Sequence, residues 1–386
     1  MTETLLHNAA RVATGDVQRP LIEGPTDIRI ADGVIASVGP SAGGSMDVVI
    51  DASHLLVMPG LWDAHHHPYF GDHTPEFDAR GYLAETVRAG TTTVVSAGTI
   101  DFPGRPRDAA GERELAILAQ RSWIHDRPLE INVLSNTVTA ATGLEERDFA
   151  VLARAGIRRI VVQTPLPTAA ETRRQVAWAR SAGMRIMAHA DGPTPLVRDA
   201  GSVGEALALI DPDIVLAVNG GDVALPEAVI DGLVGRSRSA LEVSLTGNLK
   251  VARRVVAALV AKGEPERVIL GTDSPSARGV VAPGIQRLIQ HVIGAAPSVS
   301  SAIAIAFATG NTARAYVAPG GRVAVGEPAD LVLCRAPLRS SFEDALDAIE
   351  HGDWLDVDSV FIGGTLQWAR DRPVAAQSLP LLTKAR

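Results

Sequence analysis

The chain has 386 residues, with 44 acidic against 36 basic side chains and a net charge of −8. With 46% hydrophobic and 21% charged residues it has the composition of a globular protein, which excludes a disordered or fibrous chain. The absence of a clustered basic stripe argues against nucleic acid as a partner, because phosphate binding needs concentrated Lys and Arg.

Both ends of the chain predict short β-strands. Apolar runs flank Asp32-Gly33 within residues 27–38, and Asp-Gly between such runs is a strong hairpin signal. Beyond residue 320 the pattern returns, with a strand at 329–334 and a second hairpin within 359–368. We predict that residues 1–55 and 320–386 together form one small β-sandwich domain.

Between the ends, eight short β-branched runs alternate with longer segments of helical period. The runs lie at residues 56–63, 91–96, 130–135, 157–162, 184–188, 213–218, 241–245 and 268–271. We expect helices between them, for example at 169–182 and 248–262, and Gly183 and Gly263 stand where these two should end. Eight βα units over about 260 residues are typical of a (β/α)8 TIM barrel. The sequence therefore predicts an α/β fold with a metal-dependent barrel domain at 56–319.

Four of the ten histidines fall between residues 65 and 73. Three of them, His65, His66 and His67, close the first run, at the strand end where barrel enzymes place their chemistry. Because strand side chains alternate faces, His65 and His67 point the same way and form half a site for Zn²⁺ or a similar metal. The alternative is a run of core or surface histidines.

Two further polar side chains end later strands. His189 ends the fifth run, where a lone histidine is often structural, and Asp273 follows the eighth, where it could instead cap a helix. Together with His65 and His67 they supply three imidazoles and one carboxylate at one end of the barrel. This set suits a metal site that keeps a position open for water.

The order and spacing of several motifs resemble the amidohydrolase superfamily. They are Val57-Met-Pro-Gly-Leu-Trp-Asp-Ala-His-His-His67, His189, Gly271-Thr-Asp273, 308–314 and 326–333. Residues 96–111 are similar to a segment of bacterial enamidase, which opens the ring of a tetrahydronicotinate-type cyclic enamide. The resemblance implies that His65 and His67 bind a metal, that His189 is a further ligand, and that Asp273 both touches the metal and handles the proton.

Two positions depart from what the resemblance implies. Enamidase-like members hold two metals bridged by a carboxylate at the end of strand four, and they use a histidine at the end of strand six; here the positions read Gln163 and Ala217. A neutral carboxamide cannot offset the repulsion of two dications, and alanine offers no donor. We therefore predict a site with one divalent metal, Zn²⁺ in first place with Fe²⁺ and Mn²⁺ as alternatives. Its ligands would be His65, His67, His189 and Asp273.

The function that follows is hydrolysis of a C–N bond in a small cyclic amide, imide or enamide by a metal-activated water. Asp273 would act as general base and then as general acid. Gln163, Asn219 and His73 are candidates for holding the developing oxyanion. Alternatively, Gln163 and Asn219 fill the space of a second metal, and His73 is an exposed loop residue.

A substrate that is anionic would need a cation near the barrel mouth. Arg105 and Arg107 after strand two and Arg198 after strand five are candidates, because a guanidinium matches a carboxylate. Most loop arginines, however, are merely solvated.

Three other functions stay open at this point. One is deamination of a ring amidine, because a superfamily branch of deaminases also uses one metal, although its strand-six histidine is missing here. Another is a non-hydrolytic lyase or isomerase that uses the metal as a Lewis acid. The last is a non-catalytic homologue that binds a small molecule.

The remaining expectations concern location and assembly. The single cysteine, Cys334, cannot form an internal disulfide, and no basic leader or run of 18 apolar residues is present. We therefore expect a cytoplasmic protein without a membrane partner. The resemblance favours a homo-oligomer, either a dimer or a tetramer.

Overall fold

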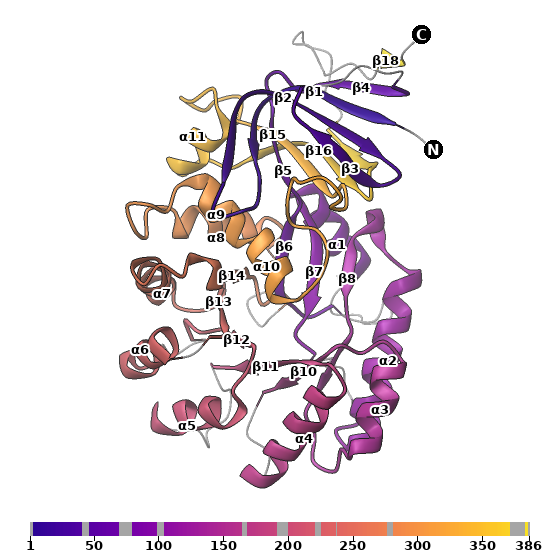
Figure 1. The fold of residues 1–386 in the computed structure, drawn as a ribbon, viewed down its shortest axis with the longest axis vertical. Helices are drawn as coiled ribbons and strands as arrows, with labels where there is room; N and C mark the ends of the chain where they lie inside the picture. The colour runs from indigo at the N-terminus through magenta and orange to yellow at the C-terminus, as the bar shows by residue number, and fades with distance from the viewer. Residues whose placement is uncertain are drawn as a thin grey trace.

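The computed structural model describes most of the chain. The described residues are 3–40, 46–68, 79–98, 104–163, 168–190, 200–220, 225–236, 238–275, 281–370 and 383–384. In Figure 1 the strands of both chain ends lie together in the upper part, and the parallel strands with their helices lie below. None of the helices in these ranges is long and apolar enough to cross a membrane.

The two ends of the chain share one β-sheet, with nine strands among the described residues. Its strands are β1 (Thr4–Ala13), β2 (Leu21–Ala31), β3 (Val34–Val38), β4 (Val48–Asp51), β5 (Leu56–Pro59), β15 (Leu331–Arg335), β16 (Asp356–Ile362), β17 (Thr365–Ala369) and β18 (Thr383–Lys384). The main order is β17-β16-β15-β5-β1-β2-β3. The two terminal segments therefore share one sheet, and their arrangement as a β-sandwich domain stays a prediction.

Both predicted hairpins are present. Asp32 and Gly33 join β2 to β3 with φ of 53° and 80°, and Gly363 and Gly364 join β16 to β17 with φ of 55° and 73°. Two successive positive φ values match the right-handed twist of the flanking strands, which is why such residues favour two-residue hairpin turns.

The run at 56–63 was predicted as one strand, and this prediction is wrong. It divides at Gly60 into β5, which pairs with β1 and β15 in the terminal sheet, and β6 (Leu61–His66), which begins the parallel strands. Gly60 lies so close to Thr92 that an added Cβ would overlap the Thr92 side chain. The chain thus passes from one sheet to the other at a position that only glycine fits.

The other predicted runs match parallel strands. They are β7 (Thr91–Ser96), β8 (Asn132–Leu134), β9 (Thr137–Thr139), β10 (Arg159–Val162), β11 (Arg185–His189), β12 (Ile214–Leu216), β13 (Ala240–Ser244) and β14 (Val268–Gly271). The run predicted at 130–135 differs, because two short strands stand in place of one. β8 pairs with β7, and β9, which follows it, pairs with β10. The parallel strands therefore form a three-stranded sheet, β6-β7-β8, and a six-stranded sheet, β14-β13-β12-β11-β10-β9.

Helices alternate with these strands. They are α1 (Ala79–Arg88), α2 (Ala109–His125), α3 (Glu146–Arg154), α4 (Ala169–Ser181), α5 (Ala200–Ile210), α6 (Glu227–Arg236), α7 (Leu249–Ala261), α8 (Gly284–Val292), α9 (Ser301–Phe307), α10 (Gly310–Ala315) and α11 (Ala345–Glu350), with short 3₁₀ turns η2 (Pro128–Glu130) and η3 (Pro265–Arg267). Asn248 caps α7 by accepting hydrogen bonds from Lys250 N and Val251 N. The predicted helices at 169–182 and 248–262 are confirmed as α4 and α7 with their caps.

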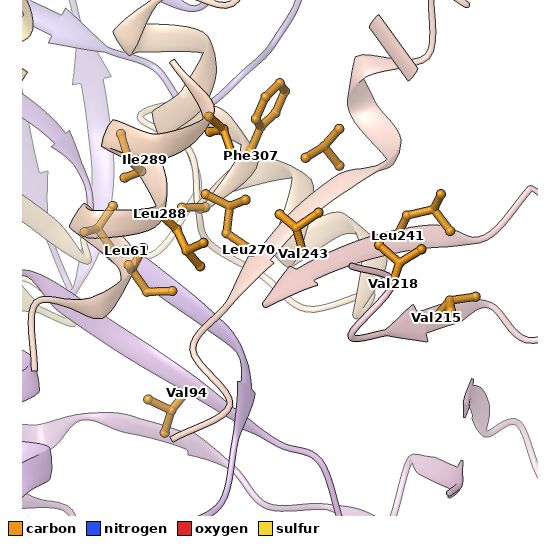
Figure 2. Packing of buried hydrophobic residues seen from close by; sticks show 14 of the residues in the cluster. Leu61, Val94, Val215, Val218, Leu241, Val243, Leu270, Leu288, Ile289 and Phe307 are labelled. Carbon is orange, nitrogen blue, oxygen red and sulfur yellow. The ribbon is translucent and has the colours of Figure 1, made fainter. Parts of the chain in front are cut away.

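Apolar side chains fill the layer between strands and helices. Figure 2 shows Leu241 and Val243 of β13 packed in this layer with Leu288 and Ile289 of α8 and Phe307 of α9. Because strand side chains alternate, the residues between them on β13 face the opposite, inner side.

The last parallel strand lies beside the first. Asp273 N donates to His65 O at 2.8 Å, and His67 N donates to Ser274 O at 2.7 Å. These two bonds place the segment after β14 against the end of β6, and this junction is where the candidate site forms.

Candidate metal centre

The first parallel strand, β6, carries a β-bulge close to its end. Its pairing with β7 steps from Asp63–Val94 to His66–Ser96, so β6 uses three residues where β7 uses two. One extra residue reverses the alternation of inward and outward side chains along a strand.

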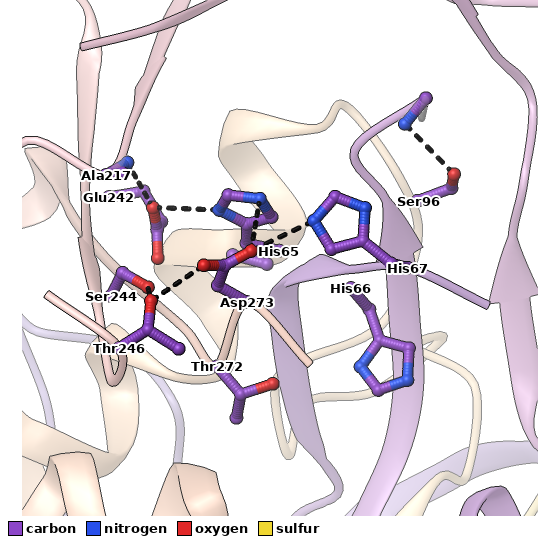
Figure 3. Close-up of polar contacts among 12 residues, drawn as sticks. His65, His66, His67, Ser96, Ala217, Glu242, Ser244, Thr246, Thr272 and Asp273 are labelled. Carbon is purple, nitrogen blue, oxygen red and sulfur yellow. Dashed lines mark hydrogen bonds and ion pairs between the residues drawn. The ribbon is translucent and has the colours of Figure 1, made fainter. Parts of the chain in front are cut away.

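This reversal decides which way the histidines face. Trp62 and Ala64 belong to the inner apolar cluster, so regular alternation would place His66 on the inner side. The bulge shifts the pattern by one residue. His65 and His67 face the same inner space, whereas His66 turns away from it (Figure 3). The prediction that His65 and His67 share one side and His66 takes the other is confirmed.

Asp63 holds the bulge in place from its buried position. Its Oδ1 accepts hydrogen bonds from His65 N at 3.1 Å and from Thr272 N at 2.8 Å. Its Oδ2 accepts a hydrogen bond from Thr272 Oγ1 and lies 3.0 Å from His66 Nδ1. One carboxylate therefore fixes the backbone of the histidine segment, the ring of His66 and the segment that leads to Asp273.

His65, His67 and Asp273 converge at the end of the strands. Asp273 Oδ1 lies 2.9 Å from His67 Nε2 and 3.3 Å from His65 Nε2 (Figure 3). One donor atom from each residue lies within 4.8 Å of the other two. Two atoms that each lie about 2.1 Å from the same ion are at most about 4.2 Å apart, so these distances from the carboxylate suit a shared Zn²⁺. Two imidazole nitrogens and a carboxylate oxygen also suit the chemistry of such a metal.

Asp273 is held as an anion. Burial alone would raise the pKa of Asp273, but the neighbouring imidazoles of His65 and His67, together with hydrogen bonds from His67 and Thr246, hold that pKa well below its usual range. Thr246 Oγ1 donates to Asp273 Oδ2 at 2.7 Å, and Ser244 Oγ lies 3.1 Å from Thr246 Oγ1. The carboxylate is therefore ionised at neutral pH and can both bind a cation and accept a proton.

His189 stands beside this group at the end of β11. Its ring lies edge-on to the ring of His65, with 4.9 Å between the centroids. In the described part of the chain, however, the set of mutually close donor atoms comprises only His65, His67 and Asp273. The role of His189 as a fourth ligand stays a prediction.

A second carboxylate lies behind His65, and the sequence reasoning missed it. Glu242 of β13 is fully buried, and its Oε2 accepts a hydrogen bond from Ala217 N at 2.5 Å and lies 3.4 Å from His65 Nδ1. The signal in the sequence was a single acidic residue in the apolar run 241–245, where alternation places Glu242 opposite the helices. Thr246 was missed too, because a threonine after a strand carries no distinctive pattern.

Comparison with known proteins identifies the family. The chain is 32% identical over 392 residues to enamidase from Eubacterium barkeri, covering 99% of this chain and 100% of the relative. A crystal structure of enamidase, described as a new member of the amidohydrolase superfamily, matches with a TM-score of 0.88 and 31% identity, over 98% of this chain and 99% of that one. The chain belongs to the amidohydrolase superfamily. This confirms the resemblance that the motifs indicate and the predicted class of enzyme.

Two further matches to this amidohydrolase are more distant or shorter. An amidohydrolase from a Sargasso Sea sample shares the fold with a TM-score of 0.67 at 22% identity, over 95% of this chain and 93% of that one. Allantoinase from Rubrobacter xylanophilus is 54% identical over 106 residues, which are 26% of this chain and 21% of the relative. No protein-family model matches the chain.

The two residues of this amidohydrolase that differ from the expected metal ligands, Gln163 and Ala217, lie at the expected strand ends. Gln163 directly follows β10 and lies two residues after Val161 of the inner cluster, so alternation places both on the inner face. Ala217 directly follows β12. Ala217 has a positive φ of 52°, and its backbone N–H is directed to Glu242. At the strand-six position the chain thus contributes a backbone donor.

Asn219 is engaged within the protein. It is fully buried, its Nδ2 donates to Ser244 O at 2.8 Å and to Asn248 O at 3.3 Å, and its Oδ1 accepts from Ser244 N at 2.7 Å. These bonds tie the segment after β12 to β13 and to the start of α7. They favour a structural role for Asn219, in which its side chain fills the space of a second metal, over contact with an oxyanion.

The candidate substrate cations are placed only in part. Arg105 Nη2 donates to both carboxylate oxygens of Glu112, at 2.5 and 2.6 Å, and the two side chains are only 5% and 8% exposed. Arg105 is thus committed to an internal ion pair in this structure. His73 and Arg198 lie outside the described residues.

Proposed function

We propose that this amidohydrolase hydrolyses a C–N bond of a small cyclic amide, imide or enamide. The observation that carries the proposal is the convergence of two imidazole Nε2 atoms on one carboxylate oxygen, 3.3 and 2.9 Å away, in a homologue of enamidase. The substrate class is proposed from the relative, and the water-activating metal site is proposed from the geometry of His65, His67 and Asp273.

The proposed site holds one divalent metal, Zn²⁺ in first place, with Fe²⁺ and Mn²⁺ as alternatives. His65, His67 and Asp273 would bind it, and the position of His189 next to His65 supports a fourth ligand. A bound metal of this kind lowers the pKa of water and polarises a carbonyl under attack. Gln163 and Ala217, where a carboxylate and a histidine were expected, support one metal over two.

Asp273 would move the proton. Its Oδ2 is oriented by Thr246, and as an ionised carboxylate it has free lone pairs that can accept a proton from the attacking water. The same group would then return the proton to the departing nitrogen. Proton transfer by a positioned group contributes about 10²–10⁴ in rate.

Gln163 is the favoured candidate for holding the developing oxyanion, because Asn219 is bound to the backbone. Arg105 would contact a substrate carboxylate only if its pair with Glu112 opened. Recognition of an anionic substrate by Arg105 therefore depends on the opening of this pair, whereas hydrolysis of the ring amide does not.

We propose a closed (β/α)8 barrel within 56–319 that begins at β6, supported by the bonds between β6 and the end of β14, and a β-sandwich formed by 1–55 and 320–386 to which β5 also belongs. Cytoplasmic location and assembly as a homodimer or homotetramer rest on the sequence reasoning. Cell fractionation and light scattering of the purified protein would test them.

Metal analysis and isotope labelling test the function. Protein prepared without added metal should contain about one equivalent of metal per chain, and two equivalents would contradict the one-metal site. Cyclic imides and enamides with and without a carboxylate, incubated in H₂¹⁸O, should give ring-opened products that carry ¹⁸O. Release of ammonia from a ring amidine would instead indicate a deaminase, and turnover without ¹⁸O would indicate a lyase or isomerase.

A further inference from the structure

We infer that Glu242 is a positioning residue for the metal ligand His65. Its carboxylate faces the Nδ1 side of the imidazole and fixes the ring so that Nε2 is presented to the metal. The inference rests on the metal site proposed above, and it adds a residue to which nothing in the sequence motifs assigns a role.

The two nitrogens of His65 face two different carboxylates. Nε2 lies 3.3 Å from Asp273 Oδ1, and Nδ1 lies 3.4 Å from Glu242 Oε2. A neutral imidazole carries one proton and one lone pair, and a metal takes the lone pair. If Nε2 binds the metal, the proton is on Nδ1 and is directed at Glu242. A carboxylate in that position orients the ring and makes the ligand more basic.

The surroundings of Glu242 are built to keep the carboxylate in place. Ala217 N donates to Oε2 at 2.5 Å, and the left-handed backbone of Ala217 accompanies this contact. Gly271 makes room on the other side, because an added Cβ there would lie 2.5 Å from Glu242 Oε1 and 2.6 Å from His65 Cβ. The ends of β12 and β14 therefore converge on this side chain of β13.

Charge gives a reason for a carboxylate in a fully buried position. A buried charge is costly unless it is paired. A divalent ion held by neutral imidazoles and by Asp273 keeps one net positive charge, and Glu242 offsets it from behind His65.

Glu242 acts through His65, because it lies on the wrong side to be a ligand. Its Oε2 contacts Nδ1, whereas Asp273 and the ring of His67 are on the Nε2 side. It is also absent from the set of mutually close donor atoms found in the described residues.

The first experiment measures Zn²⁺ affinity by competition with a chromophoric chelator on the full-length, metal-stripped chain. Glu242→Gln keeps the shape and the contact with Ala217 but removes the charge, and we expect its Kd for Zn²⁺ to rise about 10- to 100-fold. The matched control is Asp330→Asn, which alters another buried carboxylate whose partners are Gly363 N and Asn132 Nδ2. Its Kd should stay within threefold of the wild type.

The outcomes separate this inference from the function on which it rests. Wild-type affinity in a folded Glu242→Gln chain would overturn the role of Glu242 and leave the metal site intact. Absence of Zn²⁺ binding by the wild type would overturn both.

A second measurement needs no change at Glu242. In Zn²⁺-loaded protein labelled with ¹⁵N-histidine, NMR distinguishes which ring nitrogen carries the proton, and the signals of His65 are those lost in His65→Gln. We expect His65 to be protonated on Nδ1. Protonation on Nε2 would overturn the inference, because the metal would then lie on the Glu242 side of the ring.

Discussion

Asp273 adopts a left-handed backbone conformation, with φ of 55°, at the second residue after β14. Few residue types tolerate this conformation, and asparagine and aspartate are the most frequent apart from glycine. The turn after the strand therefore suits the residue that the chemistry requires, and Asp273→Asn is the substitution that disturbs the backbone least.

We predict that Asp273→Asn lowers kcat by about 10²–10⁴, because the amide cannot accept the proton of the attacking water. The effect is measured as kcat for the cyclic substrate whose product carries ¹⁸O in the labelling experiment. Unfolding by urea should be close to that of the wild type. Activity within threefold of the wild type would exclude Asp273 as the general base.

Thr246 offers a milder change at the same carboxylate. Thr246→Val removes the hydroxyl that donates to Asp273 Oδ2 at 2.7 Å and keeps the volume of the side chain. Hydrogen bonds to charged groups are worth about 1.5–3 kcal/mol, so we expect kcat to fall about 10- to 100-fold.

Thr246→Ser is the matched control for this change, because it keeps the hydroxyl. It should retain at least a third of the wild-type kcat. Equal losses in the serine and valine variants would show that the methyl group matters and the hydrogen bond does not.

At the scale of elements, the β6 bulge connects stability with metal binding. Asp63→Asn keeps one acceptor but loses the anionic Oδ2 that contacts Thr272 Oγ1 and His66 Nδ1. We expect the free energy of unfolding to fall by about 2–3 kcal/mol, the cost of leaving buried polar groups unsatisfied. Zn²⁺ affinity should fall as well, although Asp63 contacts no metal.

Urea unfolding of the metal-free chains measures this effect. The control is Asp51→Asn, because the exposed Asp51 accepts a hydrogen bond from Ser53 N in a turn that asparagine can also make. Its free energy of unfolding should change by less than about 0.5 kcal/mol. If Asp63→Asn were equally mild, the bulge would be held by the pairing of the strands alone.

The elements that local sequence specifies were predicted, and those that depend on a partner were not. The caps of α4 and α7 and the turn at Asp32-Gly33 follow from the residues themselves. The bulge in β6 depends on how β6 pairs with β7, and the division at Gly60 depends on Thr92, which lies far along the chain.

The same distinction holds in the site. His65, His67 and Asp273 could be predicted because each ends or follows a strand and belongs to a motif. Glu242 could not, because its role comes from contacts with His65, Ala217 and Gly271, which three other strands supply.

At the scale of the whole molecule, the terminal sheet depends on both ends of the chain. β15 pairs with β5 on one side and with β16 on the other. A chain that ends at Gly320 would leave the edge of β5 uncovered, with its four residues normally buried. We predict that this truncated chain aggregates, because an apolar strand edge pairs with other chains.

Expression of the two truncated forms and measurement of the soluble fraction test this prediction. The control is a chain that ends at Arg370, which keeps β15, β16 and β17 and loses, among the described elements, only β18. It should stay in the soluble fraction and bind Zn²⁺. Aggregation of both chains to the same extent would contradict the importance of the β5–β15 pairing.

His67 and Asp273 are neighbours in space but lie 206 residues apart in the chain. The histidines are therefore synthesised long before the carboxylate that completes their site, and the site closes only when the last parallel strand docks on the first. An ion that needs all three ligands arrives at the end of folding and contributes little to the transition state. Added Zn²⁺ should then leave the rate of refolding unchanged and slow the rate of unfolding, so that the metal protects the finished protein kinetically without guiding its assembly.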